Sequence, residues 1–117
     1  MDLFEAKEAV YAALKNIGVP VYRITAPAKE YDRCPYLVYS VVSNVPALAG
    51  DDGELYARVT FRVHIVTKDG AYKELYQEVC ARMGELGFMR VQTTEQRDDK
   101  VFFAIVDFRT GVESKWL

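Results

Sequence analysis

Apolar and polar residues alternate strictly over one stretch of the chain. From Leu55 to Ile65 every odd position is apolar, whereas the even positions are Tyr, Arg, Thr, Arg and His. Because successive side chains of a strand point to opposite faces of a sheet, this period of two predicts a long strand with one buried face. The face expected in the core carries Val59, Phe61, Val63 and Ile65, and the face expected outside carries Arg58, Arg62 and His64.

Two other segments show the helical period instead. Apolar residues recur every three or four positions over residues 2–17 and again over residues 70–86, which predicts two amphipathic helices. The first segment starts with Asp2 followed three positions later by Glu5, the pattern of a capping box. Gly18 and Gly87 follow the two segments and favour helix ends there.

The remaining strands are predicted from β-branched and aromatic runs between turn residues. We expect a brief edge strand within residues 19–25, a full strand over Tyr36–Val42, and a hairpin of residues 88–95 and 101–112 with a turn between them. Residues 26–35 are expected to form a loop. The run from Pro46 to Gly53, which ends in Gly-Asp-Asp-Gly, is also expected to be a loop.

These elements predict an α+β fold. Two amphipathic helices and alternating strands pack most economically as a two-layer sandwich, with a mainly antiparallel or mixed sheet and both helices on its apolar face. A length of 117 residues predicts a single domain spanning residues 1–117. The other face of the sheet must then meet water or another subunit.

Composition narrows the classes of function. The chain has 15 Lys and Arg against 17 Asp and Glu, a net charge of −2, which excludes a strongly basic nucleic-acid binder. Its first residues lack the basic start of a signal peptide, and no apolar run approaches the length of a bilayer span, so we expect an intracellular origin. Eight tyrosines and six phenylalanines indicate rings that serve both a core and a contact surface.

Few residues suggest chemistry. Cys34 and Cys80 are two cysteines 46 positions apart and His64 is the single histidine, which is too few ligands for a zinc site. The acidic group Asp51, Asp52 and Glu54 could bind a hard cation, but its spacing is more typical of a turn. We expect no catalytic group, no metal and no cofactor, and we expect the chain not to be an enzyme.

Two arginines lie on the expected outer face, and two more could extend them into a basic stripe. Arg58 and Arg62 lie two pleats apart on one strand, and Arg90 and Arg109 lie on strands expected beside it. Such a stripe can face nucleic acid, but the net acidic chain favours a solvated face with acidic partners, since phosphate contacts dominate nucleic-acid affinity. The expected partners are Glu54, Glu95 and Asp107.

The order and spacing of several local patterns resemble the tail-completion proteins of long-tailed bacteriophages and prophages, also called tail terminators or head-to-tail joining proteins. The resemblance covers nearly the whole chain and has no invariant motif. It rests on Gly18-Val19-Pro20-Val21-Tyr22 after the first helix, Cys34-Pro35-Tyr36-Leu37-Val38-Tyr39, Asp69-Gly70-Ala71-Tyr72 at the second helix, Gly87-Phe88-Met89-Arg90, and a last strand ending in Phe108-Arg109.

The resemblance implies a structural role in the virion tail or neck. Proteins of this family cap the completed tail tube and dock on head or neck proteins, usually as a six-membered ring through which DNA passes only as cargo. The ring can form on the tail from a chain that is monomeric in the host cytoplasm. The residues then expected at a contact with another subunit or a neck protein are Pro46, Leu48, Asp51, Asp52, Arg58, Arg62 and His64.

A function of another class is also compatible with the sequence. A two-layer domain of this size can be a small ligand-binding or regulatory module, or a small enzyme with a cleft between helix and sheet. Convergent polar residues beneath the helices would favour it. The expected helix faces are apolar instead, with Leu75, Val79, Met83 and Leu86 on the second helix.

Overall fold

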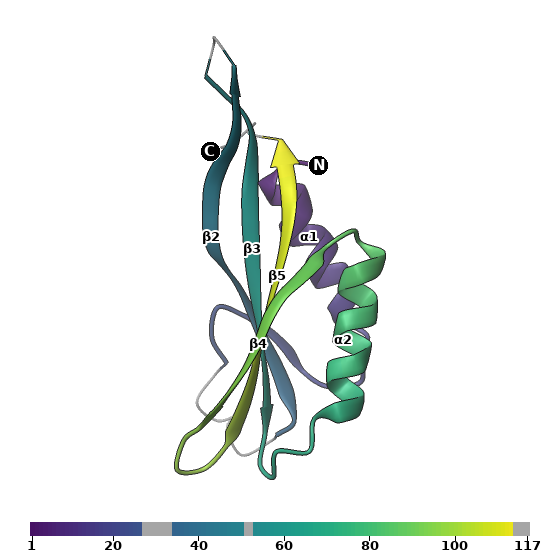
Figure 1. Cartoon of the computed structure of the whole chain (residues 1–117). Coiled ribbons are helices and arrows are strands. Elements are labelled where there is room, and N and C mark those ends of the chain that lie inside the picture. Colours follow the sequence, from purple (N-terminus) through teal and green to yellow (C-terminus); the bar gives the residue numbers. More distant parts are fainter. Residues whose placement is uncertain (27–33, 51–52, 114–117) are drawn as a thin grey trace.

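In the computed structural model, the described residues form five strands and two helices (Figure 1). The structure describes residues 1–26, 34–50 and 53–113, with only the backbone described for residues 48–50 and 53–55. The elements are α1 (Leu3–Leu14), β1 (Val21–Arg23), β2 (Tyr36–Gly50), β3 (Gly53–Thr67), α2 (Lys73–Glu85), β4 (Met89–Arg97) and β5 (Phe102–Glu113).

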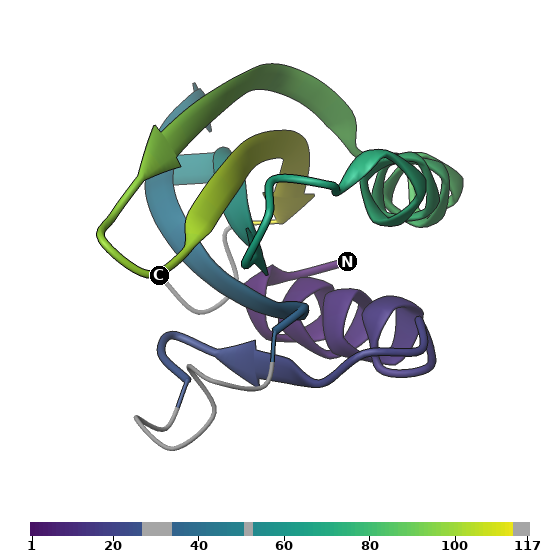
Figure 2. The same ribbon diagram turned by 90° about the horizontal axis from the view of Figure 1, so that it is seen from below.

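The sheet is mixed, with strand order β1-β2-β3-β5-β4. The short edge strand β1 runs parallel to β2, and the other neighbouring pairs are antiparallel. Both helices lie on one side of the sheet (Figure 2). The α+β two-layer prediction is therefore confirmed, including the brief edge strand. The loop expected over residues 26–35 falls largely outside the described residues.

The helix boundaries follow local chemistry. Asp2 caps α1, accepting a hydrogen bond from the Glu5 backbone at 2.9 Å while Glu5 closes the capping box. The helix ends at Leu14, three residues earlier than expected, although Ile17 still packs on the core. Similarly, α2 begins at Lys73 rather than residue 70, because Gly70 adopts a positive φ of 79°.

The core fills the layer between the helices and the sheet. Phe61 and Phe108 are its largest fully buried side chains, packed with Val10 and Leu14 of α1 and Met83 of α2. The odd positions of β3 that were predicted for this face, Val59, Phe61, Val63 and Ile65, all have 0% exposure. The alternation argument is confirmed.

The prediction of a loop from Pro46 to Gly53 is wrong. β2 continues to Gly50 and pairs with β3 as far as Gly50 opposite Gly53, so the two strands form a long hairpin arm (Figure 1). Register shifts next to Val42 and Ala47 accommodate extra residues in the ladder. Pro46, which has no backbone N–H to donate, is tolerated in β2 because this part of the strand is an edge. Beyond Tyr39, no described residue pairs with the side of β2 that faces away from β3.

The arm makes the molecule elongated. Its principal extents are 52 × 25 × 23 Å, and its radius of gyration is 15.2 Å, against about 13 Å for a compact chain of this length. Residues 43–50 lie beyond β1, and the arm projects past the helix layer (Figure 1). Within the described residues, two surfaces thus have no covering layer, the open face of the sheet and the arm.

Candidate interaction surface on the open face and the arm

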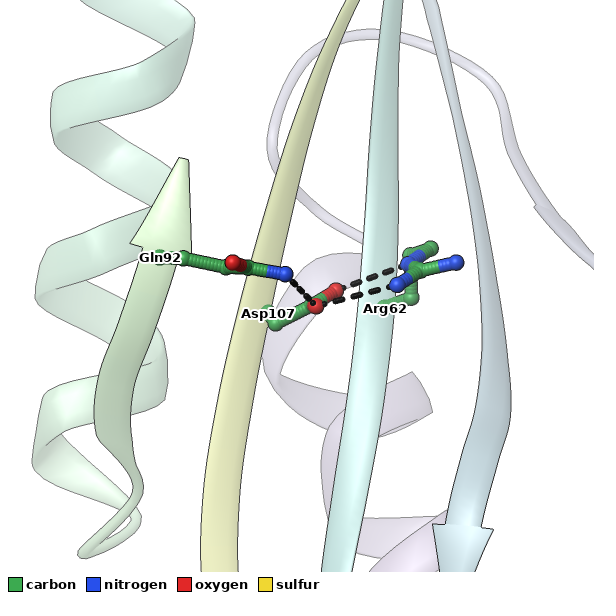
Figure 3. A network of polar contacts seen from close by, with 3 residues as sticks. All are labelled: Arg62, Gln92 and Asp107. Carbon is green, nitrogen blue, oxygen red and sulfur yellow. Dashed lines mark hydrogen bonds and ion pairs between the residues drawn. The ribbon is translucent and has the colours of Figure 1, made fainter. Parts of the chain in front are cut away.

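A three-residue polar network lies on the open face of the sheet (Figure 3). Arg62 on β3 stands opposite Asp107 on β5, which stands opposite Gln92 on β4. Arg62 donates from Nε to Asp107 Oδ1 at 2.8 Å and from Nη2 to Oδ2 at 3.1 Å, and Gln92 Nε2 donates to Oδ2 at 2.9 Å. The network joins three neighbouring strands of one subunit.

Electrostatics favours the charged form of both partners. Asp107 is 4% exposed, yet the hydrogen bonds and charge of Arg62 hold the pKa of its carboxyl below the ordinary value, with a further contribution from Gln92. The same pair raises the pKa of Arg62. The acidic partner expected for the arginines is therefore present at Asp107, within the same chain.

The other three arginines considered for this face, Arg58, Arg90 and Arg109, are not part of the network around Asp107. Arg58 lies on the open face between Val45 and Gly111, and Arg109 stands opposite Thr60 on the same face. Arg90 is different, because it pairs opposite the core residue Phe108 and so lies on the helix side. A stripe of all four arginines on one face, the alternative that the sequence left open, is therefore wrong for Arg90.

Glu95, another acidic partner expected for the arginines, is hydrogen-bonded to a tyrosine instead. It accepts a hydrogen bond from the Tyr72 hydroxyl at 2.7 Å, which raises the pKa of Tyr72 to about 12. Glu54 has only its backbone described, and Asp51 and Asp52 lie outside the described residues. Pro46 is exposed on the arm, where Leu48 pairs opposite Tyr56.

His64 borders an apolar patch on the open face. Its ring meets Phe103 edge-on, with centroids 6.2 Å apart. Burial lowers the pKa of His64, the nearby Arg62 lowers it further, and Asp107 opposes this shift. The imidazole is thus held in a half-buried position in which the neutral form is favoured.

The patch beside His64 surrounds a cavity of about 260 Å³. Buried Ala26, Tyr36, Val66 and Val101 form a second, smaller apolar cluster there, and Ile24 at the cavity is 69% exposed with a positive φ of 71°. Sequence reasoning missed this site. The signal for it was the unbroken apolar run Tyr36–Tyr39, which places apolar side chains on both faces of β2.

The pKa of His64 predicts how stability depends on pH. Because this pKa is lowered on folding, the unfolded state binds the proton first as pH falls below about 6.5, and stability is lost over that window. We expect His64→Gln to flatten the change in unfolding free energy between about pH 7.5 and about pH 5.5, measured by chemical denaturation. Equal pH slopes for parent and variant would contradict this assignment.

The described residues show little else that resembles a reactive centre. No group of three His, Cys, Asp or Glu side chains among them is arranged to hold a metal ion. Cys80 packs on the core from α2, as expected for the apolar helix face, and its burial raises the pKa of its thiol. None of the described helices is long and apolar enough to cross a membrane.

Comparison with known proteins finds similar folds among solved structures. No protein-family model and no curated protein sequence matches the chain. A solved chain from the virion of a native gene transfer agent particle superposes with a TM-score of 0.63 at 18% identity, over 92% of this chain and 94% of that chain. A second solved chain gives a TM-score of 0.50 at 17% identity, over 97% and 92%. At this identity the likeness establishes a shared fold.

Proposed function

We propose that the chain is a structural component of a phage-like virion, in which it completes the tail tube and joins it to the head or neck. The observation that carries the proposal is the fold shared, over nearly the full length of both chains, with a chain of the gene transfer agent virion. The local patterns that resemble tail-completion proteins point the same way and narrow the role to the tail end.

In this role the chain acts as a ring of copies, with six as the expected number, through which DNA passes as cargo. The charges of the open face suit such a passage. Arg62 is neutralised by Asp107 of its own chain, and the chain as a whole carries a net charge of −2. Arg62 is therefore not free to bind a phosphate strongly, which would slow moving DNA, whereas Arg58 and Arg109 add positive charge to the same face.

The arm is suited to contact a tail-tube or neck protein. It projects beyond the helices, and Val45 and Tyr56 on it are 45% and 48% exposed. Exposed aromatic and aliphatic side chains on a projecting element are typical of docking surfaces. The interface residues expected from the sequence at Pro46, Leu48 and Arg58 lie on this arm.

Shortening the arm is expected to separate assembly from folding. Replacing residues 47–56 by an Asn-Gly turn keeps the core residue Ala57 in place, so we expect the unfolding free energy to change by no more than about 1 kcal/mol. The same variant should fail to complete tails, scored by electron microscopy of particles. Normal tails from a stably folded variant would contradict the role of the arm.

Gene disruption tests the proposed function itself. Cells that produce the particles without this chain should accumulate free heads together with tails of variable length. Supplying the parent chain from a plasmid should restore joined particles. Intact, joined particles in the absence of the chain would refute the function.

The cavity on the open face favours one second candidate, a small module that binds an apolar ligand. Its lining combines the apolar Tyr36, Val38 and Phe103 with His64 and Lys100, a mixture found in ligand pockets. Replacing Val38 by Trp would fill the cavity. Under the virion proposal this variant still completes tails, whereas a ligand-dependent function would be lost.

A further inference from the structure

A groove of about 430 Å³ lies between α1 and the edge of the sheet at β1. Two cationic side chains line it from different elements, Lys7 from α1 and Arg23 from β1. Tyr39 lines it from β2. Its apolar surface is supplied by Ile24, Val41 and Phe61. The groove thus combines positive charge and a phenol with an apolar wall.

The groove is on the helix side of the sheet. Tyr39 pairs opposite the core residue Val63, and Arg23 pairs opposite Tyr39 in the parallel ladder. Paired residues of neighbouring strands project from the same face of a sheet. On α1, Lys7 and Tyr11 are four positions apart and so lie on the same side of the helix. Residues from three elements therefore converge on this groove.

Neither cation has a carboxylate partner among the described residues. The ion pairs within that part of the chain belong to other arginines. Arg23 is exposed, and Lys7 stands over the ring of Phe4, 5.2 Å from its centroid. Both charges are therefore available to a negatively charged group that enters the groove.

The hydroxyl of Tyr39 also lacks a partner within the described part of the chain. Tyr39 is 3% exposed, and none of the described groups forms a hydrogen bond with its hydroxyl. Burial raises the pKa of this hydroxyl, and Arg23 and Tyr11 are close enough to act on the same pKa, Arg23 lowering it and Tyr11 raising it. A buried hydroxyl is normally hydrogen-bonded, because an unpaired one costs free energy. In the groove it is a donor beside a cation, an arrangement that suits an oxygen acceptor.

We propose that this groove binds a glutamate or aspartate side chain presented by an acidic segment of a partner protein. Arg23 and Lys7 bind the carboxylate through charge-assisted hydrogen bonds, and Tyr39 donates a third hydrogen bond from its hydroxyl. The apolar wall contacts the methylene groups of the same side chain, which favours a carboxylate on a side chain over a free phosphate ion. That the partner belongs to a virion rests on the proposed function.

The local backbone favours recognition through side chains. The ladder between β2 and β3 shifts register at Val42, next to the groove. Such bulges, like charges at an edge, discourage the addition of a further strand. The acidic segment therefore docks by its side chains, and its backbone need not pair with β2.

Peptide binding to the purified chain tests the site. Two blocked peptides, Ala-Glu-Phe-Ala and Ala-Gln-Phe-Ala, are titrated into isotope-labelled protein, and amide chemical shifts report binding. We expect the glutamate peptide to bind about tenfold more tightly than the glutamine peptide, with the largest shifts near Lys7, Arg23 and Tyr39. Equal binding of the two peptides, or no binding of either, overturns the proposal.

Inorganic phosphate is titrated in the same way to separate the two sources of negative charge. We expect it to bind more weakly than the glutamate peptide, because it makes no use of the apolar wall. Phosphate that binds as tightly as the peptide would make the groove a site for free anions, and the choice of a protein segment would be wrong.

Charge removal provides a second measurement. Lys7→Gln and Arg23→Gln should each weaken binding of the glutamate peptide about tenfold, because each removes a charged donor. Lys73→Gln, an equal loss of charge at an exposed position of α2, is the control and should leave the affinity unchanged. Unchanged affinity in both groove variants contradicts the proposal.

Tyr39→Phe separates binding from structure. Because the hydroxyl has no hydrogen-bond partner among the described residues, its removal should weaken peptide binding several-fold without lowering the free energy of unfolding. A loss of stability with unchanged peptide affinity would make the hydroxyl structural and would overturn its role in the groove. None of these measurements needs assembled particles, so a negative result refutes the site and leaves the proposed function to the test by gene disruption.

Discussion

Replacing Phe61 by alanine is expected to lower the free energy of unfolding by about 3–5 kcal/mol. The ring has 0% exposure and meets Phe88 edge-on with centroids 5.4 Å apart, in the layer where both helices contact the sheet. Its removal leaves a cavity in this packed layer that the neighbouring side chains cannot readily fill.

Chemical denaturation of the variant measures this loss. Thr60→Ala, at the next position of β3 on the open face, is the matched control and should cost less than about 1 kcal/mol. A loss of that small size for Phe61→Ala would mean that the ring is not in the core and would refute the packing of the helices on this face.

Replacing Arg62 by alanine is expected to destabilise the fold by about 2 kcal/mol. The loss comes from Asp107, because the variant leaves a carboxylate that is 4% exposed with only Gln92 as a described side-chain partner. The Arg62 side chain itself is partly exposed, so the cost is that of leaving the buried Asp107 carboxylate without its charged partner. Arg58→Ala, on the same strand face, is the control and should have little effect.

A second substitution separates charge from packing. Asp107→Asn in the Arg62→Ala background removes the unpaired charge and should recover part of the lost stability. The parent should also lose stability as pH falls through the lowered pKa of Asp107, since its contribution is present above the unfolded value of 3.8. Two results would together contradict this account. The double variant would be no more stable than Arg62→Ala, and its unfolding free energy would fall at acid pH as steeply as that of the parent.

This pairing also changes how charge reversal must be interpreted. Arg62→Glu places a second carboxylate beside Asp107, so a failure of assembly in that variant would follow from a damaged fold as readily as from a lost contact. Arg58 is the better probe of the open face, because it is exposed and its own strand pairing does not involve a carboxylate.

The sequence predicted the layered fold because burial is periodic. A period of two in β3 and of about 3.6 in the helices assigns each apolar side chain to one face, and the core follows from those faces. The arm was missed for the opposite reason. Pro46 and the glycines are loop signals by composition, but an edge strand tolerates proline and a hairpin needs turn residues only at its tip.

The open face was only partly predictable. The pair Arg62 and Asp107 depends on the register between β3 and β5, which the packed core sets and which local patterns do not reveal. Likewise, the register shift between Arg90 and Gln92 moves Arg90 to the helix side. The contact roles expected for Arg58 and His64, and for the residues of the arm, stay predictions.

Electron cryomicroscopy of purified particles tests the central claim most directly. Particles from cells that express the chain with a small tag at its amino terminus, labelled with an antibody against the tag, should show the label at the junction of tail and head. The reconstructed junction should contain copies of this fold with the β2–β3 arm directed at a neighbouring protein. Particles that are complete and infectious or transfer-competent, yet lack the chain by both labelling and mass spectrometry, would contradict the account.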